Sequence, residues 1–572
     1  MPMAIEDRWA LPKVLVHGVA GFVHQEWRNE GPAALFGTVL QSVAARDLRF
    51  SPDRSFGQEL HRQAQSRGDA IFLTFEGESY SYRDLDDQAA RIAQALRDME
   101  IGRGSVVGIL MPNIPAFLSV IFATQRVGAC AVPINTGLKQ DGLGYILGNA
   151  GVNVLFTTAE FWPLVELVRA QYPQLQIVMV PDGSGGTADR GAIPYARLQQ
   201  SKPQAEPDPA VPPATASFLM YTSGTTGYPK GVVYPYGHSQ AKLARLSAHL
   251  LLEPGDIYYT CLPLFHANAL MITVFHSLYA DASVALSRRF SASNFWRDVR
   301  HSRATIFNTI GTMIAIMMKT APSPDERGHN VRRVLSAACP ADLWDPFQQR
   351  FGVQLWEAFG AVDGGGFTAF NFGNAPAGSI GKPLGRKRYR LIDDLGGDVP
   401  DGTPGELIHY VGHSRHGQVA YHNDSAATAS KLRDGWIHSG DLMRRDAAGF
   451  LYFVGRKTDS MRCRGENVSA LEIESAADQY PDVLESAAFG VPSELGEQDA
   501  MLVVQPRAGA TVDPAKLHAW LQGRLPRFAV PRYIRVIAAM PKTGTHRTIK
   551  HELKHEGVTP DSWREPVRAE QP

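Results

Sequence analysis

Clustered cysteines and a net charge are both missing from this sequence. Its 572 residues include only four cysteines, Cys130, Cys261, Cys339 and Cys463, and none of them forms a CxxC pair or a Cys/His cluster. This spacing indicates neither a structural zinc site nor a disulfide framework, and predicts separate buried thiols in a cytoplasmic protein. Lys plus Arg and Asp plus Glu both number 57, so no overall positive charge is present to attract nucleic acid.

Long apolar runs are also missing. No window reaches the ~18 apolar residues that a membrane-spanning helix needs. The acidic residues Glu6 and Asp7 precede the first apolar run, which is wrong for a secretory signal. Two short apolar segments within residues 11–46 could rest on a membrane surface, although packing against the main body is favoured. The sequence therefore predicts a cytoplasmic protein without a transmembrane span, with peripheral membrane contact as the alternative.

What the sequence does contain is an alternation of helix and strand patterns. SYSYRDLDDQAARIAQALRDM has helical spacing and is followed by the buried-strand pattern GSVVGILMPN, and IPAFLSVIFATQRVGACAVPIN repeats this order. Such alternation predicts an α/β fold with a parallel sheet covered by helices. The chain length and the 44% hydrophobic content exceed what one core usually holds. We predict an N-terminal extension (1–50), a large domain (51–456) and a small mobile domain (457–572).

The stretch YTSGTTGYPKG, residues 221–231, follows a short apolar strand pattern. A loop of small residues can turn several backbone N–H groups toward one point, its hydroxyls add donors, and Lys230 adds a positive charge. These properties suit a polyphosphate. The Walker pattern requires Gly-Lys directly followed by Ser or Thr, which this loop lacks, so a P-loop NTPase is excluded.

With its full sequence, this loop resembles the signature loop of the adenylate-forming enzymes, the superfamily of acyl-CoA synthetases and luciferases. Five further motifs follow in the family's order: CLPLFHANAL, SAACP, EAFGAVDGGG, WIHSGD and GRKTDSMRCRGENVSALEIE. The resemblance extends over about residues 55–565. PKTGTHRTIKHELKHEGVTPD and VPINTGLKQDGLGYIL are most similar to the very-long-chain acyl-CoA synthetases and fatty acid transport proteins. The resemblance implies a large N-terminal adenylate-forming domain of helix-flanked sheets and a small mobile C-terminal α+β domain.

The resemblance also assigns roles to individual residues. The ATP site would be formed by Thr222, Ser223, Gly224, Thr225, Thr226, Gly227, Lys230, Ala338, Phe359, Gly360, Asp363, Asp441 and Arg456. The catalytic residues would be Thr225, Lys230, Asp363 and Arg547, with Asp363 also holding Mg²⁺. The acid pocket would include His266 and Val362, CoA would meet Gly465, and Thr458 would be the hinge. The implied cofactors are ATP and Mg²⁺, with CoA as co-substrate.

Three positions depart from the family pattern where its chemistry takes place. Val362 stands where the family has Thr, and so lacks a hydroxyl. Asp363 stands where the family has Glu, and its carboxylate is a methylene shorter. Arg547 aligns with the family's C-terminal Lys, and presents a planar fork in place of a point charge; Lys542 and Lys550 are alternatives for this role.

The implied reaction joins a carboxylic acid to CoA in two steps. A carboxylate attacks the α-phosphorus of ATP to give an acyl-adenylate and pyrophosphate, and the CoA thiol then displaces AMP. The subgroup likeness indicates a long-chain or bulky acid. Two alternatives remain open: a non-standard adenylate-forming enzyme, such as one that resembles diazotases and activates nitrite, and a degenerate member that binds acyl groups or nucleotide without catalysis.

Overall fold

The chain forms two compact units, each described here from a computed structural model. The structure describes residues 54–182, 191–204, 206–208, 211–222, 229–237, 248, 251–364, 366–383, 388–412, 419–463, 466–493, 498–543 and 548–566. Unit 1 comprises Met1–Arg388 and His409–Ile437, and unit 2 comprises Tyr389–Ile408 and His438–Pro572. The predicted extension 1–50 lies outside the described residues. The predicted domain boundary at residue 457 stays a prediction.

One sheet of unit 1 has seven strands in the order β7-β6-β5-β3-β4-β8-β9. The strands are β3 (Val106–Leu110), β4 (Cys130–Pro133), β5 (Val154–Thr158), β6 (Gln176–Val180), β7 (Ile193–Pro194), β8 (Ala216–Thr222) and β9 (Lys230–Pro235). All neighbouring pairs are parallel except β8 and β9, which are antiparallel. Strand β3 reads VVGIL and β5 reads VLFTT, near-continuous runs that suit a parallel sheet covered on both faces.

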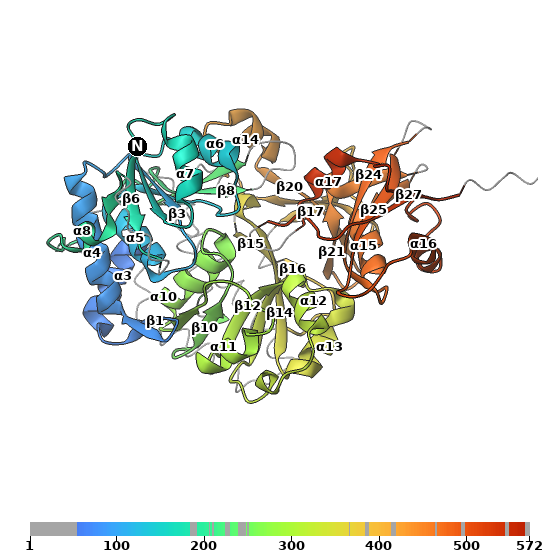
Figure 1. Ribbon diagram of the computed structural model, residues 1–572, viewed down its shortest axis with the longest axis horizontal. Helices are drawn as coiled ribbons and strands as arrows, with labels where there is room; N and C mark the ends of the chain where they lie inside the picture. Colours follow the sequence, from blue (N-terminus) through green and yellow to red (C-terminus); the bar gives the residue numbers. More distant parts are fainter. Residues whose placement is uncertain are drawn as a thin grey trace, which may run out of the picture. The chain divides into compact units, whose positions relative to one another are not determined.

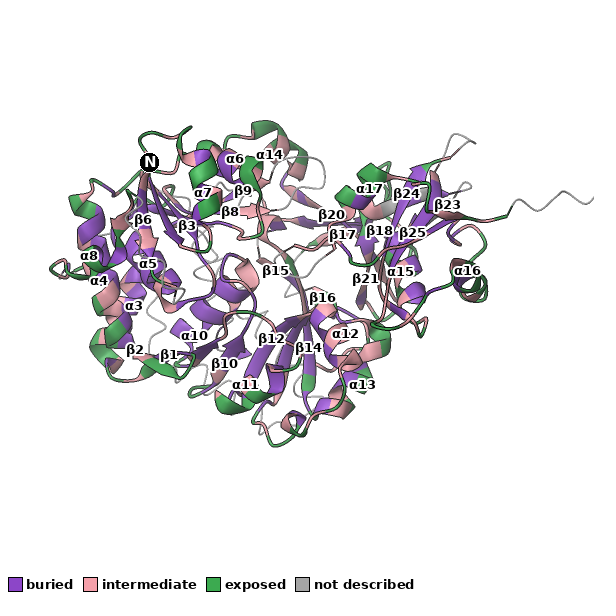
Figure 2. Cartoon of the chain, viewed as in Figure 1, coloured by how far each residue is buried: buried purple, intermediate pink, exposed green. Residues whose placement is uncertain are grey.

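The other sheet of unit 1 has nine strands in the order β16-β15-β14-β13-β12-β10-β11-β1-β2. Its strands are β1 (Ile71–Phe75), β2 (Glu78–Ser81), β10 (Ile257–Thr260), β11 (Ser283–Leu286), β12 (Ile306–Ile310), β13 (Arg333–Ala337), β14 (Gln354–Ala361), β15 (Gly366–Asn371) and β16 (Lys382–Pro383). The strands from β14 to β1 are parallel, and β2, β15 and β16 extend the edges in antiparallel pairs. Figure 2 shows β10 and β12 largely buried.

Helices cover these two sheets. They are α3 (Phe56–Arg67), α4 (Tyr82–Asp98), α5 (Pro115–Arg126), α6 (Gln140–Ala150), α7 (Trp162–Arg169), α8 (Tyr195–Gln199), the π-helix η2 (Asn268–Phe275), α10 (His276–Tyr279), α11 (Phe295–His301), α12 (Gly311–Lys319), η3 (Pro324–Glu326), α13 (Ala341–Phe351), η4 (Val362–Gly364) and α14 (Ser425–Lys431). Ser55 and Ser81 begin α3 and α4 with capping boxes. Figure 1 shows α11, α12 and α13 beside β12 and β14.

Unit 2 holds most of a five-stranded sheet, in which β21 pairs with β20 and the remaining order is β17-β18-β20-β19. These strands are β17 (Tyr389–Ile392), β18 (Gly405–Tyr410), β19 (Leu432–Arg433), β20 (Trp436–Arg445) and β21 (Leu451–Arg456), followed by η5 (Lys457–Asp459). β19 and the first residues of β20 belong to unit 1.

The rest of unit 2 consists of a hairpin, a four-stranded sheet and three helices within the described residues. A hairpin of β22 (Ser460–Cys463) and β23 (Glu466–Ser469) precedes a four-stranded sheet in the order β24-β25-β26-β27. Its elements are β24 (Val483–Pro492), β25 (Gln498–Pro506), β26 (Tyr533–Val536) and β27 (Trp563–Arg564), with helices α15 (Ala470–Asp478), α16 (Pro514–Gln522) and α17 (Lys550–Glu556). Ile473, Leu502, Leu517 and Ile534 are fully buried in its core.

The predicted α/β class is thus confirmed, with helix-covered sheets in the larger unit and a smaller C-terminal part. Within the described ranges, no helix combines the length and the apolar character needed to cross a membrane. Cys130, Cys261, Cys339 and Cys463 are free and buried, as the sequence predicts.

Candidate nucleotide and acid site

The carboxyl ends of parallel strands bring three predicted site residues to one edge of the nine-stranded sheet. Strands β10, β12, β13 and β14 run parallel to their neighbours. His266 follows β10, Ala338 follows β13, and Asp363 follows β14. Open α/β sheets bind ligands outside the carboxyl ends of their strands. The three residues therefore lie on the edge of this sheet where a ligand is expected.

Ala338 is held in an unusual conformation by a buried acid. Its φ of 65° lies in the left-handed region, which is uncommon for a residue other than glycine. The backbone N–H groups of Ala338 and Cys339 donate to the Glu357 carboxyl group at 2.5 and 3.3 Å. Burial raises the pKa of Glu357 to about 7, although its hydrogen bonds with Ser336, Cys339 and Ala338 oppose the shift. Glu357 therefore fixes the strand end predicted to line the adenine.

The end of β14 is shaped by close contact with β15. The pairing of the two strands shifts register between Phe359 and Gly360. A Cβ atom at Gly360 would lie 2.7 Å from the carbonyl oxygen of Gly366, so only glycine fits there without movement of the backbone. Phe359 is half-buried. The structure thus places the predicted ATP-site residues Phe359 and Gly360 near the end of β14, where β15 packs closely against it.

Each residue of the short helix η4 is held by a different side chain. The Tyr234 hydroxyl donates to the carbonyl oxygen of Val362 at 2.6 Å. The Tyr421 hydroxyl donates to Asp363 Oδ2 at 2.5 Å, and His409 Nε2 lies 2.9 Å from the carbonyl oxygen of Gly364. Because a carbonyl oxygen only accepts, His409 carries its proton on Nε2. The position of η4 is consequently fixed by three side chains that come from other segments of the chain.

Asp363 also forms an ion pair that the sequence did not suggest. Lys431 Nζ lies 3.0 Å from Asp363 Oδ2, and the side chains of Lys431 and Asp363 are only 13% and 19% exposed. Lys230 Nζ lies 5.5 Å from the ring centroid of Tyr421, the same tyrosine that donates to Asp363. Burial and the Asp363 charge raise the pKa of Tyr421, so its hydroxyl stays a donor. Two lysines and one carboxylate therefore lie around one tyrosine, and one of the lysines, Lys431, contacts the carboxylate.

The predicted phosphate loop begins and ends on a hairpin. Thr222 of β8 pairs with Lys230 of β9, and the Thr222 hydroxyl lies 3.5 Å from the carbonyl oxygen of Lys230. The predicted loop residues Ser223, Gly224, Thr225, Thr226 and Gly227 lie outside the described residues. The segment that contains Tyr421 runs along β9, with an antiparallel bridge from Tyr421 to Val232. This bridge explains how Tyr421 reaches the Lys230 end of the hairpin.

The predicted acid-pocket residues belong to separate segments of unit 1. His266 begins the turn before η2, donates its backbone N–H to the carbonyl oxygen of Pro263 at 3.0 Å, and packs its ring against Phe265. Val362 packs against the main hydrophobic core. His266 is half-buried. Their assignment to an acid pocket stays a prediction.

In unit 2, the predicted ribose residues Asp441 and Arg456 are direct cross-strand partners. They face each other on β20 and β21, and Arg456 Nε lies 3.7 Å from Asp441 Oδ1. Asp441 is 8% exposed, and its backbone N–H donates to Ser439 Oγ at 3.0 Å. The Arg456 side chain is 43% exposed. A buried carboxylate beside an accessible guanidinium is thus available in this unit.

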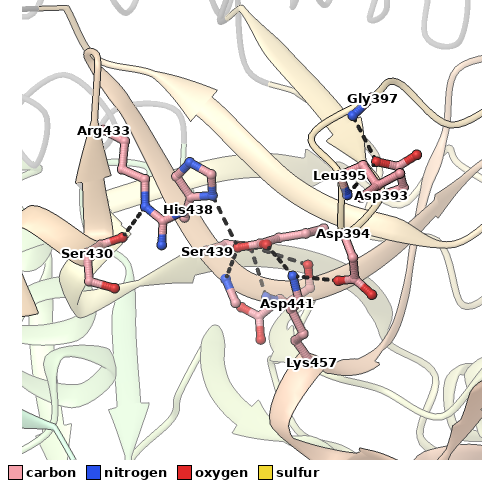
Figure 3. A network of polar contacts seen from close by, with 12 residues as sticks. Asp393, Asp394, Leu395, Gly397, Ser430, Arg433, His438, Ser439, Asp441 and Lys457 are labelled. Carbon is pink, nitrogen blue, oxygen red and sulfur yellow. Dashed lines mark hydrogen bonds and ion pairs between the residues drawn. The ribbon is translucent and has the colours of Figure 1, made fainter. Parts of the chain in front are cut away.

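A second polar network of unit 2 surrounds Glu406 (Figure 3). Lys457 Nζ lies 3.1 Å from Glu406 Oε2 and 2.9 Å from Asp394 Oδ1. The backbone N–H of Gly440 donates to Glu406 Oε1 at 3.2 Å, and His438 Nδ1 lies 3.6 Å from that oxygen. Burial lowers the pKa of Lys457, but its hydrogen bonds with Asp394 and Glu406 outweigh burial and leave the pKa raised. The network ties η5 to strand β20 at Gly440, the residue before Asp441.

Three predicted positions of the C-terminal part have little or no described geometry. Arg547 and Gly465 lie outside the described residues, and Thr458 is placed only as the central backbone residue of η5. The alternatives to Arg547 are both paired with carboxylates: Lys542 with Glu485, and Lys550 with Glu474 at 2.6 Å. The roles of these residues therefore stay predictions.

Sequence reasoning missed five residues that shape the site. They are Tyr234, Glu357, His409, Tyr421 and Lys431. Glu357 stands inside the quoted motif EAFGAVDGGG, so an acid on a buried strand was a signal that could have been used. Lys431 is 68 positions from Asp363 in sequence, and no local pattern marks the pair.

Comparisons with known proteins identify the family of this chain. The model of the AMP-binding enzyme family matches residues 60–412, and that of the AMP-binding enzyme C-terminal domain matches residues 472–547. A medium/long-chain fatty-acid–CoA ligase, FadD6 of Mycobacterium tuberculosis, is 32% identical over 89% of this chain and 86% of its own length. Steroid-22-oyl-CoA synthetase of Rhodococcus jostii is 33% identical over 79% of this chain and 82% of its own length.

A solved structure supports the fold. O-succinylbenzoate coenzyme A synthetase of Bacillus subtilis, in complex with ATP and magnesium ion, superposes with a TM-score of 0.74 at 23% identity, over 87% of this chain and 99% of its own. The predicted resemblance to adenylate-forming enzymes is confirmed, because the first family model alone spans more than half of the chain. The chain belongs to the family of AMP-binding enzymes.

Proposed function

We propose that this chain is an AMP-forming ligase that joins a medium- to long-chain or bulky carboxylic acid to CoA through an acyl-adenylate. The observation that carries the proposal is the cluster of Lys230, Lys431 and Asp363 around Tyr421, at the carboxyl edge of a parallel sheet in a member of this family. Two curated relatives of similar length, a medium/long-chain fatty-acid–CoA ligase and a steroid-22-oyl-CoA synthetase, support the acid class. A cytoplasmic location is part of the proposal.

The first step brings two anions together, so the residues mainly position them and neutralise charge. In the proposed site, Lys230 and the preceding loop hold the outer phosphates. Asp441 accepts hydrogen bonds from the ribose hydroxyls, and Arg456 adds positive charge beside it. The adenine lies against the end of β13, where the hydrogen bond to Glu357 holds Ala338 in its unusual backbone conformation.

The described contacts of Asp363 fit the Mg²⁺ that the family implies. Its Oδ2 is occupied by Tyr421 and Lys431, whereas no contact to Oδ1 is recorded within the described part of the chain. Mg²⁺ in nucleotide sites is commonly bound by one or two carboxylates together with phosphates and water. When bound, the ion would neutralise the phosphate charge. Asp363 would hold it through Oδ1, directly or through water.

The proposal is tested with the purified protein, ATP, Mg²⁺, CoA and a panel of acids of increasing chain length, including a steroid acid and nitrite. We expect AMP, pyrophosphate and an acyl-CoA product, and an acyl-adenylate when CoA is omitted, each detected by mass spectrometry. ADP as the main product would contradict the proposal. Turnover with nitrite alone would favour the non-standard adenylate-forming alternative, and ATP binding without turnover of any acid would favour the degenerate one.

A further inference from the structure

The half-buried ion pair between Lys431 and Asp363 has a consequence for nucleotide binding. Asp363 is the carboxylate proposed for Mg²⁺, yet a lysine already contacts its Oδ2 at 3.0 Å. A carboxylate next to an ammonium group attracts a second cation less strongly, because the ammonium offsets its charge. Lys431 therefore weakens the attraction of Asp363 for a metal ion.

The same lysine adds positive charge where phosphates are proposed to bind. Lys230 lies over the ring of Tyr421, and Lys431 lies beside the hydroxyl end of the same residue through Asp363. Counting these side chains gives two positive charges and one negative charge. Tyr421 also forms part of the wall of an open pocket of about 640 Å³, together with Asp424 and Thr428. Tyr421, which joins the two lysines, thus lies in the wall of this pocket, and Lys431 stands in sequence between the lining residues Ala429 and Leu432.

We propose that Lys431 is a resident cation of the ATP site, which supplies part of the charge neutralisation that Mg²⁺ would otherwise provide. ATP would then retain measurable affinity in the absence of metal, and Asp363 would oppose metal-free binding by engaging Lys431. This inference rests on the proposed function, because it requires that the chain binds ATP. It adds a nucleotide-binding residue that sequence reasoning did not identify.

The test is calorimetric titration of ATP into the full-length protein, in EDTA and in excess Mg²⁺. Lys431→Met should weaken ATP binding in EDTA by about 10- to 100-fold, the usual worth of one charge-assisted hydrogen bond. The loss in Mg²⁺ should be several-fold smaller, because the ion replaces part of the missing charge. Lys431→Arg keeps the charge and should retain most of the metal-free affinity. Lys202→Met, an exposed lysine of unit 1, is the matched control and should change neither value.

Asp363→Asn gives an independent test with the opposite sign. Removing the carboxylate charge releases Lys431 and reduces repulsion of the phosphates. ATP should therefore bind more tightly in EDTA, whereas the gain produced by Mg²⁺ should shrink. If the ion pair only stabilised the fold, Asp363→Asn would not both tighten ATP binding in EDTA and reduce the gain in affinity that Mg²⁺ produces.

Two sets of results would overturn the inference while leaving the proposed function intact. One is an equal loss of ATP affinity in EDTA and in Mg²⁺ for Lys431→Met, in a variant whose thermal unfolding matches that of the wild type. The other is metal-free ATP binding that does not change in Lys431→Met or does not tighten in Asp363→Asn. If the wild-type protein fails to bind ATP even with Mg²⁺, the proposed function itself is wrong.

Discussion

Glu357 gives a sharp test of the site, because its stabilising effect should depend on pH in a specific direction. The residue is 2% exposed, and burial raises the pKa of its carboxyl group from 4.5 to about 7, although hydrogen bonds with Ser336, Cys339 and Ala338 oppose the shift. The folded protein therefore holds this proton more tightly than the unfolded chain does. The resulting stabilisation is complete below a pH of about 4.5 and is lost as the pH rises through about 7.

The size of the effect follows from the two pKa values. A pKa difference of one corresponds to about 1.36 kcal/mol, so the change from 4.5 to about 7 amounts to about 3 kcal/mol at most. Glu357→Gln replaces the carboxyl group with a neutral amide that still accepts a hydrogen bond from the Ala338 N–H. The free energy of unfolding of the wild type, relative to that of Glu357→Gln, should therefore fall by up to about 3 kcal/mol between pH ~4.5 and ~8.

Urea unfolding at a series of pH values, followed by the fluorescence of the buried Trp356 and its neighbours, measures this difference. Glu326→Gln is a matched control with the opposite sign. Burial raises the pKa of Glu326, but hydrogen bonds from Arg350 and the Ser323 backbone outweigh burial and leave the pKa lowered. Its stabilisation is present above a pH of about 4.5 and is lost as the pH falls. A Glu357→Gln difference that is constant with pH, or that grows as the pH rises, would refute the reasoning.

Three further predictions concern other parts of the site. Asp441→Ala should weaken ATP binding by calorimetry far more than binding of the acid, since two charge-assisted hydrogen bonds of ~1.5–3 kcal/mol each would be lost; unchanged ATP affinity would contradict the ribose role. Gly360→Ala should lower the free energy of unfolding by about 1–3 kcal/mol through overpacking, whereas Gly144→Ala, which meets only ordinary contacts in α6, should be neutral or stabilising. Arg547→Ala should slow adenylate formation by about 10²–10³ and spare thiol transfer from preformed acyl-adenylate, in separate assays of the two steps.

The sequence predicted the parts of this fold that local patterns determine. The apolar run VVGIL marks the buried parallel strand β3, and helical spacing marks α4. The family motifs EAFGAVDGGG and WIHSGD identified Asp363 and Asp441 as candidate residues. Motif spacing therefore located the candidate residues along the chain, and the strand order then brought Ala338 and Asp363 to one edge of the sheet.

Local patterns could not predict the contacts that give the site its charge balance. Lys431 ends a short helix with a mostly polar sequence, SAATASK, and nothing in that helix distinguishes a half-buried ion-pair partner from a solvated surface lysine. Its contact with Asp363 depends on the segment at Tyr421 running along β9, which is a long-range arrangement. The loops that hold Ser223 and Arg547 lie outside the described residues, so their roles rest on the sequence.

The departures from the family pattern at Val362 and Asp363 can be understood together with the contacts that surround them. Val362 has no side-chain hydroxyl, but its carbonyl oxygen accepts a hydrogen bond from Tyr234. The position of η4 therefore does not depend on the missing hydroxyl. Asp363 is a methylene shorter than Glu, and its Oδ2 is held by Tyr421 and Lys431. Although its Oδ2 atom is occupied, Asp363 can still bind a cation through Oδ1. Asp363 and Lys431 therefore act together. Lys431 places a positive charge next to the Asp363 carboxylate, and the segment of Val362 and Asp363 needs this charge to bind phosphates.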